Sequence, residues 1–248
     1  MKKLLTFSLF LLLAFASKAQ TDTKFYELRT YYCNEGRLHD LLARFQKHTI
    51  ALFQKHGMGV VGFWVPMDNK ENKLIYVLSY PNKAARDASW KSFSDDPVWK
   101  TALANSIKEG EIISKVESVF LKTTDFSPNN FTSVGDRVFE LRIYKATPTH
   151  LPNLLERFRG NTLRLFEKHG MTNLVYWTVP EKEAGSEDML YYLLAHKTKE
   201  AGLAEFKAFG ADPDWIAVRK ASEEKAGGSL TVNVKSEYLV PVDFSVWK

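Results

Sequence analysis

The sequence has a single cysteine and lacks the short motifs that carry much of enzyme chemistry. Cys33 is the only cysteine in 248 residues, so neither an intramolecular disulfide nor a cysteine-based metal site can form within the chain. The His-Glu-x-x-His, Gly-x-Ser-x-Gly and glycine-rich phosphate-loop motifs are all missing. We therefore expect no metal and no cofactor.

Long apolar runs are missing except at the start of the chain. Two lysines precede an apolar run from Leu4 to Ala16, and Ser17 and Ala19 occupy the −3 and −1 positions for cleavage. This run is well short of the roughly 20 residues that a spanning helix needs. We predict a signal peptide at residues 1–19, export to the periplasm or the extracellular space, and no stable membrane anchor after processing.

A charge excess that would favour a nucleic-acid partner is also missing. The whole chain has 34 basic and 29 acidic residues, but residues 1–19 contain three of the lysines and no acid. The remaining 31 basic and 29 acidic residues leave a net charge of +2, which gives no reason to expect nucleic-acid binding. The apolar and charged fractions are those of an ordinary globular protein.

One unit of sequence occurs twice. The stretch Phe53–Met58 returns as Phe166–Met171, 113 positions later, and residues 41–58 match residues 154–171 at 11 of 18 positions. We predict two domains, at residues 20–126 and 138–248, joined by a linker at residues 127–137. Cys33 corresponds to Ala146, so we interpret it as a small, partly buried residue that fills space in the core.

Hydrophobic periodicity predicts the same order of elements in both copies. In the first copy, apolar residues at steps of three and four over about 20 residues predict a helix that ends before Gly57. Aromatic and β-branched runs predict strands, and Asp96-Pro97 predicts the start of a short helix. The order β-α-β-β-α-β is that of a ferredoxin-like fold. The predicted elements are strands 25–31, 60–65, 74–80 and 116–122 with helices 38–56, 83–93 and 97–108, then strands 138–144, 174–179, 190–196 and 232–239 with helices 151–169 and 199–209.

Several motifs in both copies resemble the NIPSNAP family. They are a Tyr-Glu-Leu-Arg strand, a helix closing on Lys-His-Gly-Met, a tryptophan in the next strand and an Asp-Pro-x-Trp turn, seen at Tyr26–Tyr31, Leu52–Met58, Trp64 and Asp96–Trp99 and again at Phe139–Tyr144, Leu165–Met171, Trp177 and Asp212–Trp215. The resemblance implies a dimeric α/β-barrel fold, in which two ferredoxin-like sheets close face to face with the helices outside. Relatives with this barrel include cofactor-free monooxygenases, haem enzymes and proteins of no known activity. The fold alone therefore does not identify a reaction for this chain.

Alternation along the first strand of each copy defines the candidate ligand-binding residues. Glu, Arg and Tyr share one face and apolar residues share the other. We expect the charged face to point into the barrel, and Phe139, Leu141 and Ile143 to pack against helices. The alternative is a structural Glu-Arg ion pair between the sheets. The candidates are Glu27, Arg29, Tyr31, Glu140, Arg142 and Tyr144.

Four repeated residues are weaker candidates. His56 and His169 each stand just before a glycine at a helix end, which favours hydrogen bonding to that end over catalysis. Trp64 and Trp177 occupy equivalent places in two strands, where aromatic residues more often form core.

Two functions remain open. The first is a non-catalytic module that binds a small molecule in the barrel. The alternative is a cofactor-free monooxygenase or isomerase that uses the same cavity, with Tyr31, Tyr144 and the Glu-Arg groups as acid-base residues. Because one chain carries both copies, we expect the barrel to close within a single polypeptide as a pseudo-dimer. Homo-oligomer formation is then not required.

Overall fold

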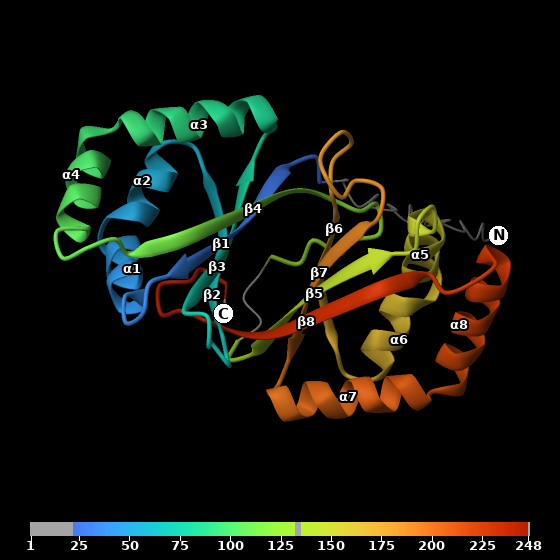
Figure 1. The fold of residues 1–248 in the computed structure, drawn as a ribbon. Helices are drawn as coiled ribbons and strands as arrows, with labels where there is room; N and C mark the ends of the chain where they lie inside the picture. Colours follow the sequence, from blue (N-terminus) through green and yellow to red (C-terminus); the bar gives the residue numbers. More distant parts are fainter. Residues whose placement is uncertain (1–21, 132–134, 248) are drawn as a thin grey trace, which may run out of the picture.

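The computed structural model describes residues 22–131 and 135–247. The predicted signal peptide lies outside these residues. Two copies of one α+β unit lie side by side, with the two sheets facing each other and the helices on the outer sides (Figure 1). The predicted fold class is confirmed.

All eight strands belong to one closed antiparallel barrel, in the order β1-β3-β2-β8-β5-β7-β6-β4. Two short seams join the copies: β2 pairs with β8, and β4 pairs with β6. The strands are β1 (Phe25–Cys33), β2 (Gly59–Pro66), β3 (Lys73–Tyr80), β4 (Ile113–Thr123), β5 (Val138–Ala146), β6 (Thr172–Thr178), β7 (Met189–His196) and β8 (Thr231–Pro241).

The first long helix of each copy contains a π-helical turn that the periodicity did not predict. In this wider turn the Thr49 hydroxyl donates to the carbonyl of Arg44 over 3.2 Å, and Thr162 does the same to Arg157 over 3.1 Å. Gly57 ends the helix with φ of 75°, as predicted. The helices are α1 (Leu38–Arg44), η1 (Phe45–Thr49), α2 (Ile50–Lys55), α3 (Lys83–Asp95) and α4 (Pro97–Ser106), then α5 (Leu151–Arg157), η2 (Phe158–Thr162), α6 (Leu163–Lys168), α7 (Lys199–Ala211) and α8 (Pro213–Ala226).

The Asp-Pro turn begins α4 as predicted, but the interpretation of His56 is wrong. Asp96 accepts a hydrogen bond from the backbone N–H of Val98 at 2.8 Å. The His56 side chain does not bond to the end of its own helix. Its Nε2 lies 2.8 Å from Asp96 Oδ2, so it joins the end of α2 to the start of α4. His169 makes the equivalent contact with Asp212 at 2.6 Å.

Aromatic side chains fill one end of the barrel. Trp64 and Trp177 are fully buried there, in a cluster that also contains Tyr26, Phe139 and Trp247. The interpretation of both repeated tryptophans as core is confirmed. Cys33 and Ala146 are both buried under the helices, so the filler interpretation of Cys33 is confirmed as well.

A short segment at the end of each copy also packs against the other copy. After β4, Ser127 accepts a hydrogen bond from the backbone of Tyr176 in the second copy at 2.9 Å. After β8, Ser245 accepts one from the backbone of Phe63 in the first copy at 3.0 Å, and Phe244 packs on the Phe63 ring. Because of these contacts, residues from each copy complete the core of the other copy.

Candidate functional site

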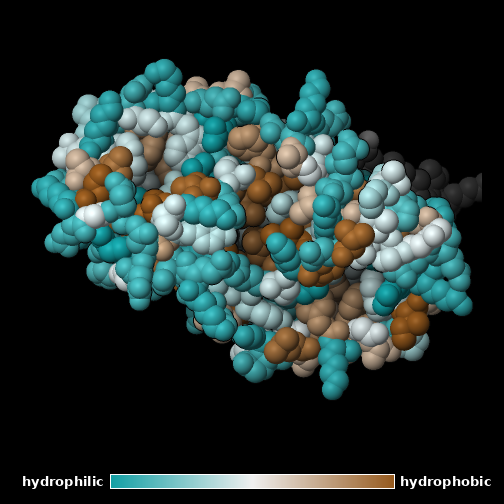
Figure 2. All heavy atoms as spheres, viewed as in Figure 1, coloured by the Kyte–Doolittle hydropathy of each residue, from teal (hydrophilic) through white to brown (hydrophobic). Residues whose placement is uncertain are grey.

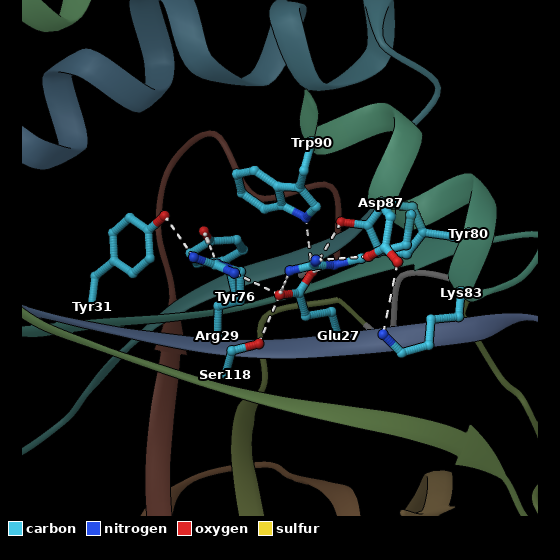
Figure 3. A network of polar contacts seen from close by, with 10 residues as sticks. Glu27, Arg29, Tyr31, Tyr76, Tyr80, Lys83, Asp87, Trp90 and Ser118 are labelled. Carbon is cyan, nitrogen blue, oxygen red and sulfur yellow. Dashed lines mark hydrogen bonds and ion pairs between the residues drawn. The ribbon is translucent and has the colours of Figure 1, made fainter. Parts of the chain in front are cut away.

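Glu27 is the centre of a buried polar network between β1 and α3 (Figure 3). Its carboxylate is fully buried and accepts hydrogen bonds from the guanidinium groups of Arg29, at 2.5 Å, and Arg86, at 2.6 and 2.9 Å. Trp90 from α3 and Ser118 from β4 donate at 2.9 and 2.7 Å. The two positive charges therefore share one acid.

This arrangement keeps Glu27 ionised. Burial raises the pKa of the Glu27 carboxyl, but hydrogen bonds from Arg86 and the charge of Arg29 outweigh burial and hold the pKa at about 2. Arg29 also donates to the hydroxyl of Tyr76 at 3.0 Å, and its guanidinium lies 4.4 Å from the centre of the Trp90 ring.

The second copy builds the same network with different donors. Glu140 accepts from Arg142 at 2.6 Å, and Arg142 lies over Phe206, which replaces Trp90. The fully buried His196 lies between two acids, with Nε2 at 3.0 Å from Glu140 and Nδ1 at 2.6 Å from Glu205. Because both ring nitrogens face carboxylates, His196 must carry two protons to donate to both. Burial lowers the pKa of His196, but the bonds to Glu140 and Glu205 outweigh it and raise the pKa.

The predicted orientation of the candidate residues is wrong. The charged face of β1 and β5 points towards the helices, and Phe139 and Leu141 lie in the barrel interior. The physical reason is the supply of hydrogen-bond donors. Side chains of α3 and α7 reach the charged face, whereas the interior is formed by two sheet faces that pack apolar residues together. Glu27, Arg29, Tyr31, Glu140, Arg142 and Tyr144 therefore do not line the barrel cavity.

The barrel does contain a cavity, at the end opposite the aromatic cluster. Its volume is about 730 Å³, and both copies contribute to it. Figure 2 shows hydrophobic side chains gathered around a hollow between the two halves. The apolar lining residues are Leu28, Ile75, Val119, Leu141, Ile143, Met189 and Tyr191.

Charged side chains of both signs surround this apolar lining. Lys73 from β3 lies 2.8 Å from Glu237 of β8 and 3.0 Å from Glu71, so an ion pair links the two copies at the cavity. The charged lining residues are three lysines and three glutamates, and their formal charges cancel. They are Lys73, Lys145, Lys235, Glu71, Glu117 and Glu237.

Sequence reasoning missed His196 and the cavity lining for two different reasons. His196 has no histidine counterpart, because the equivalent residue in the first copy is Tyr80. Comparing the copies at each aligned position would have identified this exchange. Leu141 and Ile143 line the cavity, but their apolar character favours the helix side, because hydrophobicity alone does not distinguish two covered faces of one sheet.

Two further properties concern membrane spans and metal sites. Within residues 22–131 and 135–247, no helix has the length and apolar character needed to cross a bilayer. The same residues contain no group of three or more histidine, cysteine or acidic side chains that could hold a metal ion.

Two ferredoxin-like sheets that close into one barrel, with helices outside, define a dimeric α/β-barrel protein made from a single chain. The NIPSNAP family model matches residues 26–128 and 139–246. The chain therefore belongs to the NIPSNAP family, with one domain in each copy.

Two relatives share limited sequence identity with this chain. Protein NipSnap homolog 3B of Mus musculus is 29% identical over 82 residues, which are 33% of this chain and 32% of the mouse protein. This chain thus matches about a third of that relative's length. A solved NIPSNAP domain protein from Burkholderia xenovorans, described as uncharacterized, is 22% identical with a TM-score of 0.38, covering 42% of this chain and 98% of its own.

Two solved barrels cover both copies. A putative monooxygenase from Fusobacterium nucleatum has a TM-score of 0.58 at 10% identity, over 89% of this chain and 93% of its own. A mutant chlorite dismutase from Candidatus Nitrospira defluvii has a TM-score of 0.50 at 7% identity, over 88% and 91%. At these identities the likeness shows the fold alone.

Proposed function

We propose that this protein binds a small apolar or amphipathic molecule in the cavity between its two copies. The observation that carries the proposal is the 730 Å³ cavity with an apolar lining and a charged rim. Binding sites for small molecules have this size and this mixture of apolar surface and few polar groups. Because the charges of the rim cancel, the proposed ligand needs no net charge.

Binding without catalysis fits the titratable groups of the cavity. Burial raises the pKa of Tyr191, and burial together with the hydrogen bond to Glu117 raises the pKa of Tyr32. Neither phenol is then poised to lose a proton near neutral pH, as a general base or acid would need to be. The Glu-Arg-Tyr groups face away from this cavity and have protein partners.

We also propose that the protein acts outside the cytoplasm, after cleavage between Ala19 and Gln20. The support is the order of charged, apolar and small residues over positions 1–19.

A fluorescent probe tests the binding proposal. Nile red is uncharged and apolar, so we expect saturable binding and increased fluorescence with residues 20–248. Thr30 lines the cavity from β1, and Thr30→Trp should place an indole ring in it and weaken Nile red binding. Val116→Trp is the matched control, because Val116 lies on the adjacent strand, is exposed and does not line the cavity.

Circular dichroism would establish that both variants are folded. Equal Nile red affinity in the wild type and in folded Thr30→Trp would refute binding in this cavity.

A further inference from the structure

A second, smaller cavity lies on the other face of β1. Its volume is about 230 Å³, and it lies between β1 and the helices of the first copy. Tyr31 lines it, whereas the neighbouring Thr30 and Tyr32 line the barrel cavity. The walls are largely aromatic and include Phe45, Trp90 and Trp99. The strand therefore separates two independent spaces.

Arg44 is the buried, positively charged residue in the lining of this second cavity. It is the last residue of α1, it precedes the π-helical turn, and only 5% of its surface is exposed. Its Nη1 donates to the Ser106 hydroxyl at 3.0 Å, and its guanidinium carbon lies 5.4 Å from the centre of the Trp99 ring. The buried Nε has no hydrogen-bond acceptor. Among residues 22–131 and 135–247, no carboxylate forms an ion pair within 4 Å of Arg44.

Arg44 therefore lacks part of the hydrogen bonding and charge pairing that a buried guanidinium group needs. Burial lowers the pKa of the Arg44 guanidinium, which means that its charged form is disfavoured by the surroundings. A buried cation with free donors is costly unless an anion pairs with it. A planar carboxylate is the anion whose two oxygens match the guanidinium donors.

In the second copy, a carboxylate of the protein lies near the equivalent arginine. Arg157 is the counterpart of Arg44, and it lies over Trp215 at 5.1 Å. Its Nη1 is 3.7 Å from Glu223 on α8, which is a charge contact and not a hydrogen bond, since Nε and Nη1 of Arg157 have no hydrogen-bond partner. The residue equivalent to Glu223 is Ile107, which directly follows α4 and lines the cavity beside Arg44. The first copy thus has the arginine and the aromatic ring, and it has an isoleucine where the second copy has Glu223.

We infer that the cavity beside Arg44 binds a small carboxylate with a flat apolar body. The carboxylate pairs with Arg44 where the second copy has Glu223, and the apolar body packs between the aromatic walls. Glu111 also lines the cavity, and it is exposed to solvent. Its charge opposes an anion, but solvent screens it, so Glu111→Gln should strengthen binding modestly. This site is additional to the barrel cavity and does not rest on that proposal.

Benzoate is the probe that matches this chemistry, with acetate and hexanoate for comparison. Isothermal titration of residues 20–248 should show one saturable benzoate site, with weaker binding of acetate because acetate lacks the apolar body. Arg44→Met should weaken benzoate binding by at least about tenfold. Arg157→Met is the matched control and should leave the affinity unchanged. Thr30→Trp should also leave it unchanged, which separates this site from the barrel cavity.

A second variant keeps the test decisive if Arg44→Met does not fold. Ile107→Glu introduces the acid that the second copy has, so it should compete with benzoate and weaken binding while the protein without ligand stays as stable as the wild type. Equal benzoate affinity in the wild type and in folded Ile107→Glu would overturn the inference. Absence of saturable binding of all three carboxylates to the folded wild type would overturn it as well.

Discussion

Replacing Glu27 by Gln should be among the most damaging conservative changes in the first copy. The substitution keeps the size of the side chain and removes one negative charge. Arg29 and Arg86 then lose the acid they share, and their side chains are only 13% and 19% exposed. The amide also places an N–H₂ group among donors, since Trp90 and Ser118 already donate to this carboxylate.

The expected cost follows from the burial of this network. Breaking a buried ion pair by removing one partner typically destabilises a protein by about 3–5 kcal/mol. For a chain of this size, each kcal/mol lowers the melting temperature by about 2–4 °C. We therefore expect a melting temperature about 6–20 °C below that of the wild type.

The measurement is thermal and urea unfolding followed by circular dichroism. Glu117→Gln is the matched control, because Glu117 pairs with Lys115 near the surface and its side chain is 48% exposed. The loss of that pair should cost less than about 1 kcal/mol. If Glu27→Gln were as stable as Glu117→Gln, the network around Glu27 would not stabilise the fold and our reasoning would be refuted.

Three further predictions concern pH and the dependence of the two copies on each other. Because the folded pKa of Glu27 is lowered to about 2 from 4.5, its contribution to stability should be complete above about pH 4.5 and lost as pH falls towards 2, and the loss should be smaller in Glu27→Gln. Because the pKa of His196 is raised from 6.5, its contribution should be complete below about pH 6.5 and lost as pH rises through the higher folded pKa. Melting curves in this range should show a smaller loss for His196→Tyr, which introduces the residue of the first copy. Residues 20–126 and 131–248, expressed separately, should each be less stable than the whole chain, because Ser127 and Ser245 contact opposite copies; two stable monomers of native content would contradict the shared core.

The architecture could be predicted from the sequence because the same sequence unit occurs twice. A motif such as Lys-His-Gly-Met at a helix end is weak alone, but its repetition at a constant offset defines the register of two complete units. Helix starts at Asp96 and Asp212 follow from local chemistry, since the aspartate and the following proline both favour a first helical turn.

The site was harder to predict because both faces of each sheet are covered, one by helices and the other by the second sheet. Alternation along β1 correctly separates Glu27 and Arg29 from Tyr26 and Leu28, but it does not say which set faces the other sheet. That choice depends on Arg86 and Trp90, which lie on α3, about 60 residues further along the chain. Arg44 was missed because its significance depends on Ile107, where the second copy has Glu223.

Native mass spectrometry of the mature chain tests the central claim, that the space between the two copies is a ligand site, most directly. Wild-type protein purified under gentle conditions and supplied with Nile red should carry one additional ligand mass. Folded Thr30→Trp should carry less of it, while Val116→Trp should carry it as the wild type does. The same occupancy in folded Thr30→Trp as in the wild type would contradict the claim, because the added indole takes up part of the cavity that both copies line.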